Sequence, residues 1–196
     1  MYSLVETFDS IQGEGLYNGS LCFFLRLGGC DIGCGWCDEK KSWDESKYPK
    51  SSINEIVDLV IKSPSDIVVV TGGEPLMHNL DELTIELKKH KRVHLETSGA
   101  YNLTGDWDWI TLSPKKRKLP SPKIYKKTNE LKCIIYNNSD FEFAISESKK
   151  VSKDCLLYLQ PEWSKKDYMV EEIINFIKLN PRFKLSIQKH KYLGLQ

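Results

Sequence analysis

Three cysteines lie within one short glycine-rich stretch, in the order Cys30-x-x-x-Cys34-x-x-Cys37. Thiolates bind zinc and iron–sulfur clusters, and glycines allow the backbone to wrap closely around a bulky group. Structural zinc takes four protein ligands, and no second Cys pair or Cys–His pair lies at zinc-finger spacing. Asp38 or a distant histidine could supply a fourth ligand, so zinc stays open as an alternative. A redox Cys-x-x-Cys pair would leave Cys30 without a role.

Three cysteines also suit a 4Fe-4S cluster in which the protein holds three irons and the fourth is open. An open iron can be chelated by the amino and carboxylate groups of S-adenosylmethionine. The Cys-x3-Cys-x2-Cys spacing, with Trp36 directly before the third cysteine, resembles the radical S-adenosylmethionine superfamily. Gly72-Gly73-Glu74-Pro75 resembles that superfamily's Gly-Gly-Glu-Pro motif, which meets the methionyl amino group. The resemblance implies that the three thiolates hold the cluster and that Trp36 packs against adenine.

The resemblance extends over essentially the whole chain to one family, the 7-carboxy-7-deazaguanine synthases. Residues 11–15, Ile-Gln-Gly-Glu-Gly, look like the family motif that contacts a pterin. Arg26 matches a family arginine that pairs with the substrate carboxylate, and a planar guanidinium suits such a bidentate contact. The alternative is an arginine that reaches from a strand into solvent. The substrate contacts that the resemblance implies are Ile11, Gln12, Gly13, Glu14, Arg26, Thr71, His190 and Gln196.

A third motif, Ser113-Pro114-Lys115, resembles the Ser-Pro-Lys contact that this family makes with S-adenosylmethionine. Together with the superfamily motifs it implies a set of cofactor contacts drawn from four separate stretches of the chain. They are Trp36, Cys37, Asp38, Gly73, Glu74, Ser98, Ser113, Pro114 and Lys115.

One position departs from the family pattern. The family reads Cys-Asp-Thr after its last cluster cysteine, and the threonine oxygen helps to hold a magnesium ion, whereas this chain reads Cys37-Asp38-Glu39. A carboxylate is a good magnesium ligand, although Glu39 is longer and charged. We expect magnesium here, and two alternatives remain: an ion pair of Glu39 with Lys40 or Lys41, or a site without the metal.

The resemblance implies a lyase of queuosine and 7-deazapurine biosynthesis. The substrate would be 6-carboxy-5,6,7,8-tetrahydropterin, and the product would be 7-carboxy-7-deazaguanine, formed with loss of ammonia. It also implies a reducing partner such as flavodoxin or ferredoxin, and a homodimer. Two other functions remain open. One is a glycyl-radical activating enzyme, and the other is a non-enzymatic zinc or iron–sulfur module that contacts RNA through the lysines of residues 115–127.

The elements that must position these residues alternate between β-rich runs and amphipathic stretches. After an opening β-rich segment at 2–8, strands are predicted at 21–27, 67–71, 93–96, 109–112, 131–136, 155–159 and 183–187. A capping box of Ser52 and Glu55 begins one helix, and helical periodicity continues in three further stretches near 80–87, 140–149 and 170–177. Residues 97–108 and 113–130 show no helical period. This pattern predicts an α/β fold, an incomplete βα barrel of the radical S-adenosylmethionine type, with its chemistry at the carboxyl ends of the strands.

Length and composition suit one compact domain, residues 1–196, with extensions at both ends that complete the substrate site. Hydrophobic residues make up 40% and charged residues 28% of the chain, and no apolar run is long enough to span a bilayer. The formal net charge of +1 gives no general attraction to nucleic acid or membrane, and we expect residues 115–127 to form a solvated loop. Without a signal peptide, a cytoplasmic location is expected, with buried strand cysteines at Cys22, Cys133 and Cys155.

Overall fold

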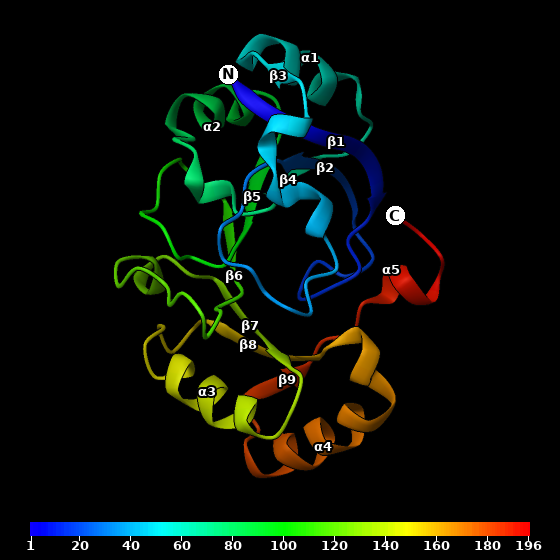
Figure 1. Cartoon of the computed structure of the whole chain (residues 1–196), viewed down its shortest axis with the longest axis vertical. Helices are drawn as coiled ribbons and strands as arrows, with labels where there is room; N and C mark the ends of the chain where they lie inside the picture. The colour runs from blue at the N-terminus through cyan, green and yellow to red at the C-terminus, as the bar shows by residue number, and fades with distance from the viewer.

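The computed structural model describes all 196 residues, and its nine strands form one open sheet (Figure 1). The strand order is β3-β1-β2-β4-β5-β6-β7-β8-β9, and no pairing joins the two edges. Strands β2 and β4 to β9 run parallel to one another. Strand β1 lies antiparallel to both of its neighbours, β2 and β3. The bounds are β1 Tyr2–Ile11, β2 Leu21–Leu27, β3 Lys50–Ser51, β4 Ile67–Gly72, β5 Arg92–Thr97, β6 Trp109–Leu112, β7 Glu130–Ile135, β8 Leu156–Pro161 and β9 Phe183–Leu185.

Helices cover the outer face of this sheet. In Figure 1, α1 and α2 lie beside the early strands, and α3 and α4 lie against β7, β8 and β9. The α-helices are α1 Ile53–Lys62, α2 Asp81–Lys88, α3 Ser139–Ser148, α4 Lys166–Leu179 and the short α5 Lys189–Tyr192. The 3-10 turns are η1 Lys40–Trp43, η2 Glu45–Lys47, η3 Pro75–Met77, η4 Ile124–Lys126 and η5 Trp163–Lys165.

The predicted incomplete βα barrel is confirmed. The connections from β5 to β6 and from β6 to β7 carry no α-helix, and η4 is the one helical turn between them. The capping box that begins α1 is present, because the Ser52 and Glu55 side chains each accept a hydrogen bond from the other's backbone N–H. No helix of the structure is long and apolar enough to cross a membrane.

Some boundaries differ from the predictions. β1 continues three residues further, to Ile11, because it stays paired with β2 as far as Leu21. Cys155 is buried, as are Cys22 and Cys133, but it lies in the turn before β8 rather than in a strand. β3, α5 and the 3-10 turns were not predicted, since segments of two to four residues are too short to show a hydrophobic period.

The two faces of the sheet differ in chemistry. Successive strand residues point to opposite faces. On the outer face, Leu25, Val70 and Leu95 join a core of 29 buried residues. On the inner face, a small apolar cluster around Phe24 and Val69 gives way to polar side chains nearer the carboxyl ends of the strands. The register places Arg26 beside Thr71 on that face, and the same alternation continues along the neighbouring strands.

Candidate active site

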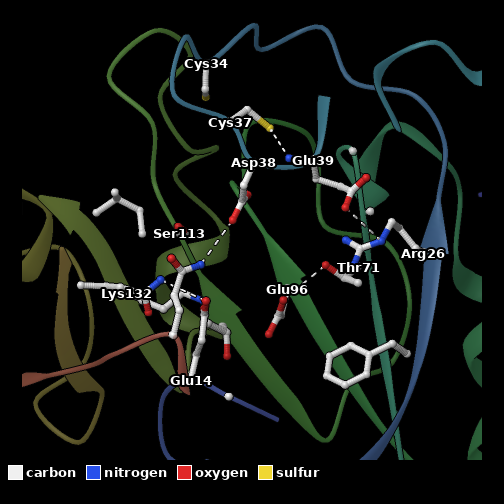
Figure 2. Close-up of a pocket in the computed structure, with 18 of the residues that line it drawn as sticks. Glu14, Arg26, Cys34, Cys37, Asp38, Glu39, Thr71, Glu96, Ser113 and Lys132 are labelled. Carbon is white, nitrogen blue, oxygen red and sulfur yellow. Dashed lines mark hydrogen bonds and ion pairs between the residues drawn. The ribbon is translucent and has the colours of Figure 1, made fainter. Parts of the chain in front are cut away.

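The polar inner face opens into one cavity of about 460 Å³ at the carboxyl ends of the parallel strands. That volume is typical of a small-molecule site. The thiols of the cysteine loop border one end of the cavity, and the side chains of Glu14 and Lys132 lie at the opposite end (Figure 2). The side chains between them include Arg26 and Thr71 on one side and Ser113 on the other.

The cysteine loop offers three free thiols to this cavity. Cys30, Cys34 and Cys37 are partly buried and line it, and the Glu39 backbone N–H donates to Cys37 Sγ at 3.4 Å. No group of three or more His, Cys, Asp or Glu side chains is placed to hold a single metal ion. Free thiols around a shared space, with an amide donor to sulfur, fit a bulkier iron–sulfur cluster.

The Gly-Gly turn packs directly against that loop. Gly72 has φ +141°, and a Cβ there would lie 2.1 Å from the Leu27 carbonyl oxygen. The Gly73 N–H donates to the same oxygen at 3.0 Å, and the Glu74 N–H donates to the Gly29 carbonyl at 2.8 Å. The turn therefore fixes the start of the cysteine loop by backbone contacts that leave no space for a side chain.

The Glu74 carboxylate is buried and already surrounded by donors. It accepts hydrogen bonds from Thr97 Oγ1 at 2.5 Å, from the Leu76 N–H at 3.0 Å, and from both the backbone N–H, at 2.8 Å, and the hydroxyl of Ser98. A carboxylate offers about four acceptor positions, so these bonds occupy the group. Glu74 thus joins the turn after β4 to the loop after β5, and its predicted contact with S-adenosylmethionine stays a prediction.

Lys115 brings a positive charge close to the thiols. Burial lowers the pKa of this ammonium, while the thiol of Cys34 acts against that shift. Its Nζ donates to Ser113 Oγ at 2.7 Å and lies 5.1 Å from the ring centre of Trp36. Burial raises the pKa of the Cys34 thiol above its usual value, and the positive charge of Lys115 acts against that shift.

A hydrogen-bonded network forms the far end of the cavity. The buried Lys132 Nζ contacts Glu14 Oε2 closely, and Gln160 Nε2 donates to Glu14 Oε1 at 3.0 Å. Burial lowers the pKa of Lys132, yet the neighbouring carboxylates outweigh burial and raise that pKa above its usual value. Nearby, Gln12 Nε2 donates to Glu96 Oε1 at 2.9 Å and Thr71 Oγ1 donates to Glu96 Oε2 at 3.3 Å. The network presents amide, carboxylate and ammonium groups, which suit a heterocycle with several donors and acceptors.

The C-terminal segment lies against the N-terminal motif. The Lys189 N–H donates to the Gly13 carbonyl at 3.0 Å, and a Cβ on Gly13 would lie 2.1 Å from His190 Nδ1. The Gln196 side chain donates to Glu6 Oε2 at 3.0 Å, and its backbone carbonyl accepts from Ser10 Oγ at 2.9 Å. Gly13 is therefore needed for the histidine to reach the cavity.

The same segment contacts the cysteine loop. Lys191 Nζ lies 2.5 Å from Asp38 Oδ2, and Gln188 Nε2 donates to the same oxygen at 3.3 Å. Burial raises the pKa of Asp38, but these donors outweigh it and hold that pKa below its usual value. In Figure 1 the C-terminus accordingly lies beside the end of β1.

The structure brings the predicted site residues together. Every one of them lines the cavity except Pro114, which is buried between Ser113 and Lys115. Their individual roles stay predictions. Further charged and amide side chains on the strands also line the cavity; Glu96 and Gln160 were expected only as residues at strand ends, and the others were not predicted, although a polar residue within a strand run is the signal that could have found them. They are Glu6, Glu96, Lys132 and Gln160, and they are joined by Lys41, Trp163 and Lys191 from the short helical segments η1, η5 and α5.

The fold, the thiol loop and the Gly-Gly turn together define the class. The sequence profile of the radical SAM superfamily matches residues 25–110 of the chain. Among curated proteins, the 7-carboxy-7-deazaguanine synthase of Synechocystis sp. is 49% identical over 196 residues, covering 100% of this chain and 94% of that protein. The enzyme of the same name from Flavobacterium psychrophilum is 48% identical, covering 100% of this chain and 93% of that protein.

A solved structure agrees with these relatives. The crystal structure of QueE from Escherichia coli superposes with a TM-score of 0.83 at 28% identity, covering 96% of this chain and 94% of that one. This chain is thus a radical SAM protein by fold and by site. It belongs to the 7-carboxy-7-deazaguanine synthase family.

Proposed function

We propose that this chain converts 6-carboxy-5,6,7,8-tetrahydropterin to 7-carboxy-7-deazaguanine, with contraction of the ring and loss of ammonia. The observation that carries the proposal is one cavity with three free thiols at one end and the Glu14–Lys132 network at the other. A glycyl-radical activating enzyme acts on a peptide backbone, and such a substrate would give this network no function.

Cys30, Cys34 and Cys37 would hold a 4Fe-4S cluster, with S-adenosylmethionine bound between the cysteine loop and the turn after β4. When bound, the two cofactors supply a 5′-deoxyadenosyl radical, with S-adenosylmethionine acting as a reusable cofactor. The chain itself binds and orients the pterin. Gln12, Glu14 and the C-terminal tail, including His190, would contact the heterocycle. The carboxylate would then lie toward Arg26.

Arg26 is suited to that carboxylate. Its Nε is paired with Glu6 Oε1 at 2.8 Å, while its two Nη nitrogens make no hydrogen bond within the protein. Phe8 supports the guanidinium from below, with 5.8 Å between Arg26 Cζ and the ring centre, and Phe8 itself stacks on Phe24. A guanidinium held at Nε still has free donors for a bidentate contact.

We also propose the wider organisation that the sequence predicted. Residues 1–196 would act as one domain, whose N-terminal and C-terminal extensions complete the substrate site. The cluster would receive its electron from a flavodoxin or ferredoxin in the cytoplasm. We propose a homodimer from the family resemblance. The open sheet is compatible with it, because β3 and β9 are edge strands whose outer sides have no partner.

Anaerobic reconstitution tests the main proposal. Protein loaded with iron and sulfide is expected to absorb near 400 nm and, with S-adenosylmethionine and a reductant, to convert the pterin to product. The Cys34→Ala variant should take up less cluster and lose turnover, while Cys155→Ala, which removes a buried thiol outside the cavity, should keep both. A zinc-loaded protein that takes up no iron would exclude the proposal, as would an iron-loaded protein that cleaves S-adenosylmethionine but leaves the pterin unchanged.

A further inference from the structure

Four charged side chains form a closed ring at the cavity wall, where β1 and β2 meet the end of the cysteine loop. Arg26 Nε lies 2.8 Å from Glu6 Oε1 and 3.6 Å from Glu39 Oε2. Lys41 Nζ lies 3.2 Å from Glu6 Oε1 and 3.6 Å from Glu39 Oε1. Positive and negative groups therefore alternate around the ring, and all four side chains line the cavity.

The ring decides between the alternatives that the sequence left for Glu39. The Glu39 carboxylate is paired with Lys41 and Arg26, and a divalent ion bound to it would lie close to both cations. Like charges at such distances repel strongly where water is partly excluded. Magnesium prefers several oxygen ligands in octahedral geometry, and the Glu39 carboxylate that would supply one of them is already paired with two cations.

The other nearby carboxylates are occupied. Asp38 is held by Lys191 and Gln188, and Glu6 by Arg26, Lys41 and Gln196. One oxygen, Glu39 Oε1, is buried without a hydrogen bond, and an unsatisfied carboxylate oxygen can mark a metal ligand. Here the Lys41 ammonium lies 3.6 Å from that oxygen, so a small movement of the lysine side chain would let it donate a hydrogen bond to Glu39 Oε1. The residues present do not fit magnesium.

We propose that this ring binds the substrate carboxylate without a divalent metal ion, with Arg26 and Lys41 as its two positive contacts. The inference rests on the proposed function and adds Lys41 as a specificity residue of the same site. With two carboxylates and two cations the empty ring is neutral, and each cation is held in place by Glu6 and Glu39. Both cationic side chains are therefore already in position at the cavity wall before a carboxylate ligand binds.

Lys41 is placed to reach such a ligand. Its side chain is 53% exposed and tethered at both sides by carboxylates, whereas the Arg26 side chain beneath it is 16% exposed. In Figure 2 the Arg26 guanidinium points into the cavity next to Glu39. A carboxylate between the Arg26 Nη nitrogens and the Lys41 ammonium would gain charge-assisted hydrogen bonds from both sides.

Two measurements on the reconstituted enzyme test the metal. Turnover of the pterin is expected to be the same within about twofold with EDTA and with added MgCl2. In the presence of S-adenosylmethionine, the electron paramagnetic resonance signal of free Mn²⁺ should not decrease as enzyme is added, with or without the pterin. Turnover that requires magnesium, or one Mn²⁺ bound per chain, would overturn the inference.

Substitutions test Lys41. Lys41→Met is expected to raise the KM for the pterin about tenfold, as the loss of one charge-assisted contact predicts, with kcat much less affected. Lys41→Arg should recover most of the affinity. The matched control is Lys40→Met, because Lys40 is exposed, lies outside the cavity and makes no ion pair. An unchanged KM in Lys41→Met would refute the role of this lysine.

Failure of the inference can be told from failure of the proposed function. If the pterin is converted only when magnesium is present, the function holds and the metal-free site is wrong. If the pterin is converted under no condition, the function is wrong, and the Mn²⁺ signal still decides whether the site takes a metal.

Discussion

At the scale of single residues, the cavity contains buried charges that the fold must support. The Lys132 and Glu14 side chains are 8% and 13% exposed and contact each other at the far end of the cavity. Such pairs add little net stability compared with apolar residues, but removing one partner leaves the other charge uncompensated. The pair therefore makes the site vulnerable to single substitutions.

We predict that Lys132→Met lowers the free energy of unfolding by about 3 to 5 kcal/mol, since it leaves the buried Glu14 carboxylate without its cation. The double variant Glu14→Gln, Lys132→Met should recover a large part of that loss, because the carboxylate in direct contact with Lys132 is then replaced by a neutral amide. Urea unfolding of the cluster-free protein measures both. Equal losses in the single and double variants would show that packing, rather than charge, accounts for the effect.

At the scale of elements, the pairing of β2 with β4 fixes the cysteine loop relative to the rest of the site. Leu27 and Gly72 are paired in the register of these two strands, and the Gly73 N–H donates to the Leu27 carbonyl immediately beyond. The backbones approach so closely that the turn tolerates no Cβ. The position of the three thiols thus depends on a turn more than 30 residues further along the chain.

Gly72→Ala is predicted to destabilise the protein by roughly 3 kcal/mol or more, because its Cβ would meet the Leu27 backbone at a φ that alanine disfavours. Gly19→Ala is the matched control: its φ of +94° is also unfavourable, but no atom lies within 4 Å of the added Cβ. It should cost about 1 to 2 kcal/mol. Thermal unfolding measures the loss of stability in both variants. Equal losses would show that the unfavourable φ alone, and not the contact with Leu27, destabilises Gly72→Ala.

At the scale of the whole molecule, the two ends of the chain close the site together. β1 carries the motif of residues 11–15, and the tail after β9 returns across the cavity to Gly13, to Glu6 and, through Lys191, to Asp38. The ion pair to Asp38 is exposed on the Asp38 side, at 59% of that side chain. Exposed ion pairs are weak and are screened by salt.

We therefore predict that the KM for the pterin rises a few-fold between low and high ionic strength, as the tail loses its contact with the cysteine loop. Lys191→Met should raise the KM at low salt and remove part of its salt dependence, whereas Lys189→Met, which leaves the Asp38 contact intact, should behave like the unsubstituted protein. Steady-state kinetics at several NaCl concentrations measure this. If the KM of Lys191→Met depends on salt as strongly as the KM of the unsubstituted protein, the salt effect arises from other charges of the site.

Much of the site follows from sequence alone. The spacing of Cys30, Cys34 and Cys37, the Gly-Gly-Glu-Pro turn and the alternation of apolar runs indicated the class of cofactor and an incomplete βα barrel, because these signals are local in the chain. The early strands and α1 could be placed within a few residues for the same reason. Even the missing helices between β5 and β7 were visible as stretches with no helical period.

Only the tertiary structure decided which side chains are neighbours. It placed Lys132 on Glu14, Lys191 on Asp38 and His190 against Gly13, partners separated by more than 100 residues, for which local periodicity carries no information. It also decided the surroundings of Glu39. The residue type allowed magnesium or an ion pair, and the distances to Arg26 and Lys41 favour the ion pair, because electrostatic preference depends on separation in space rather than along the chain.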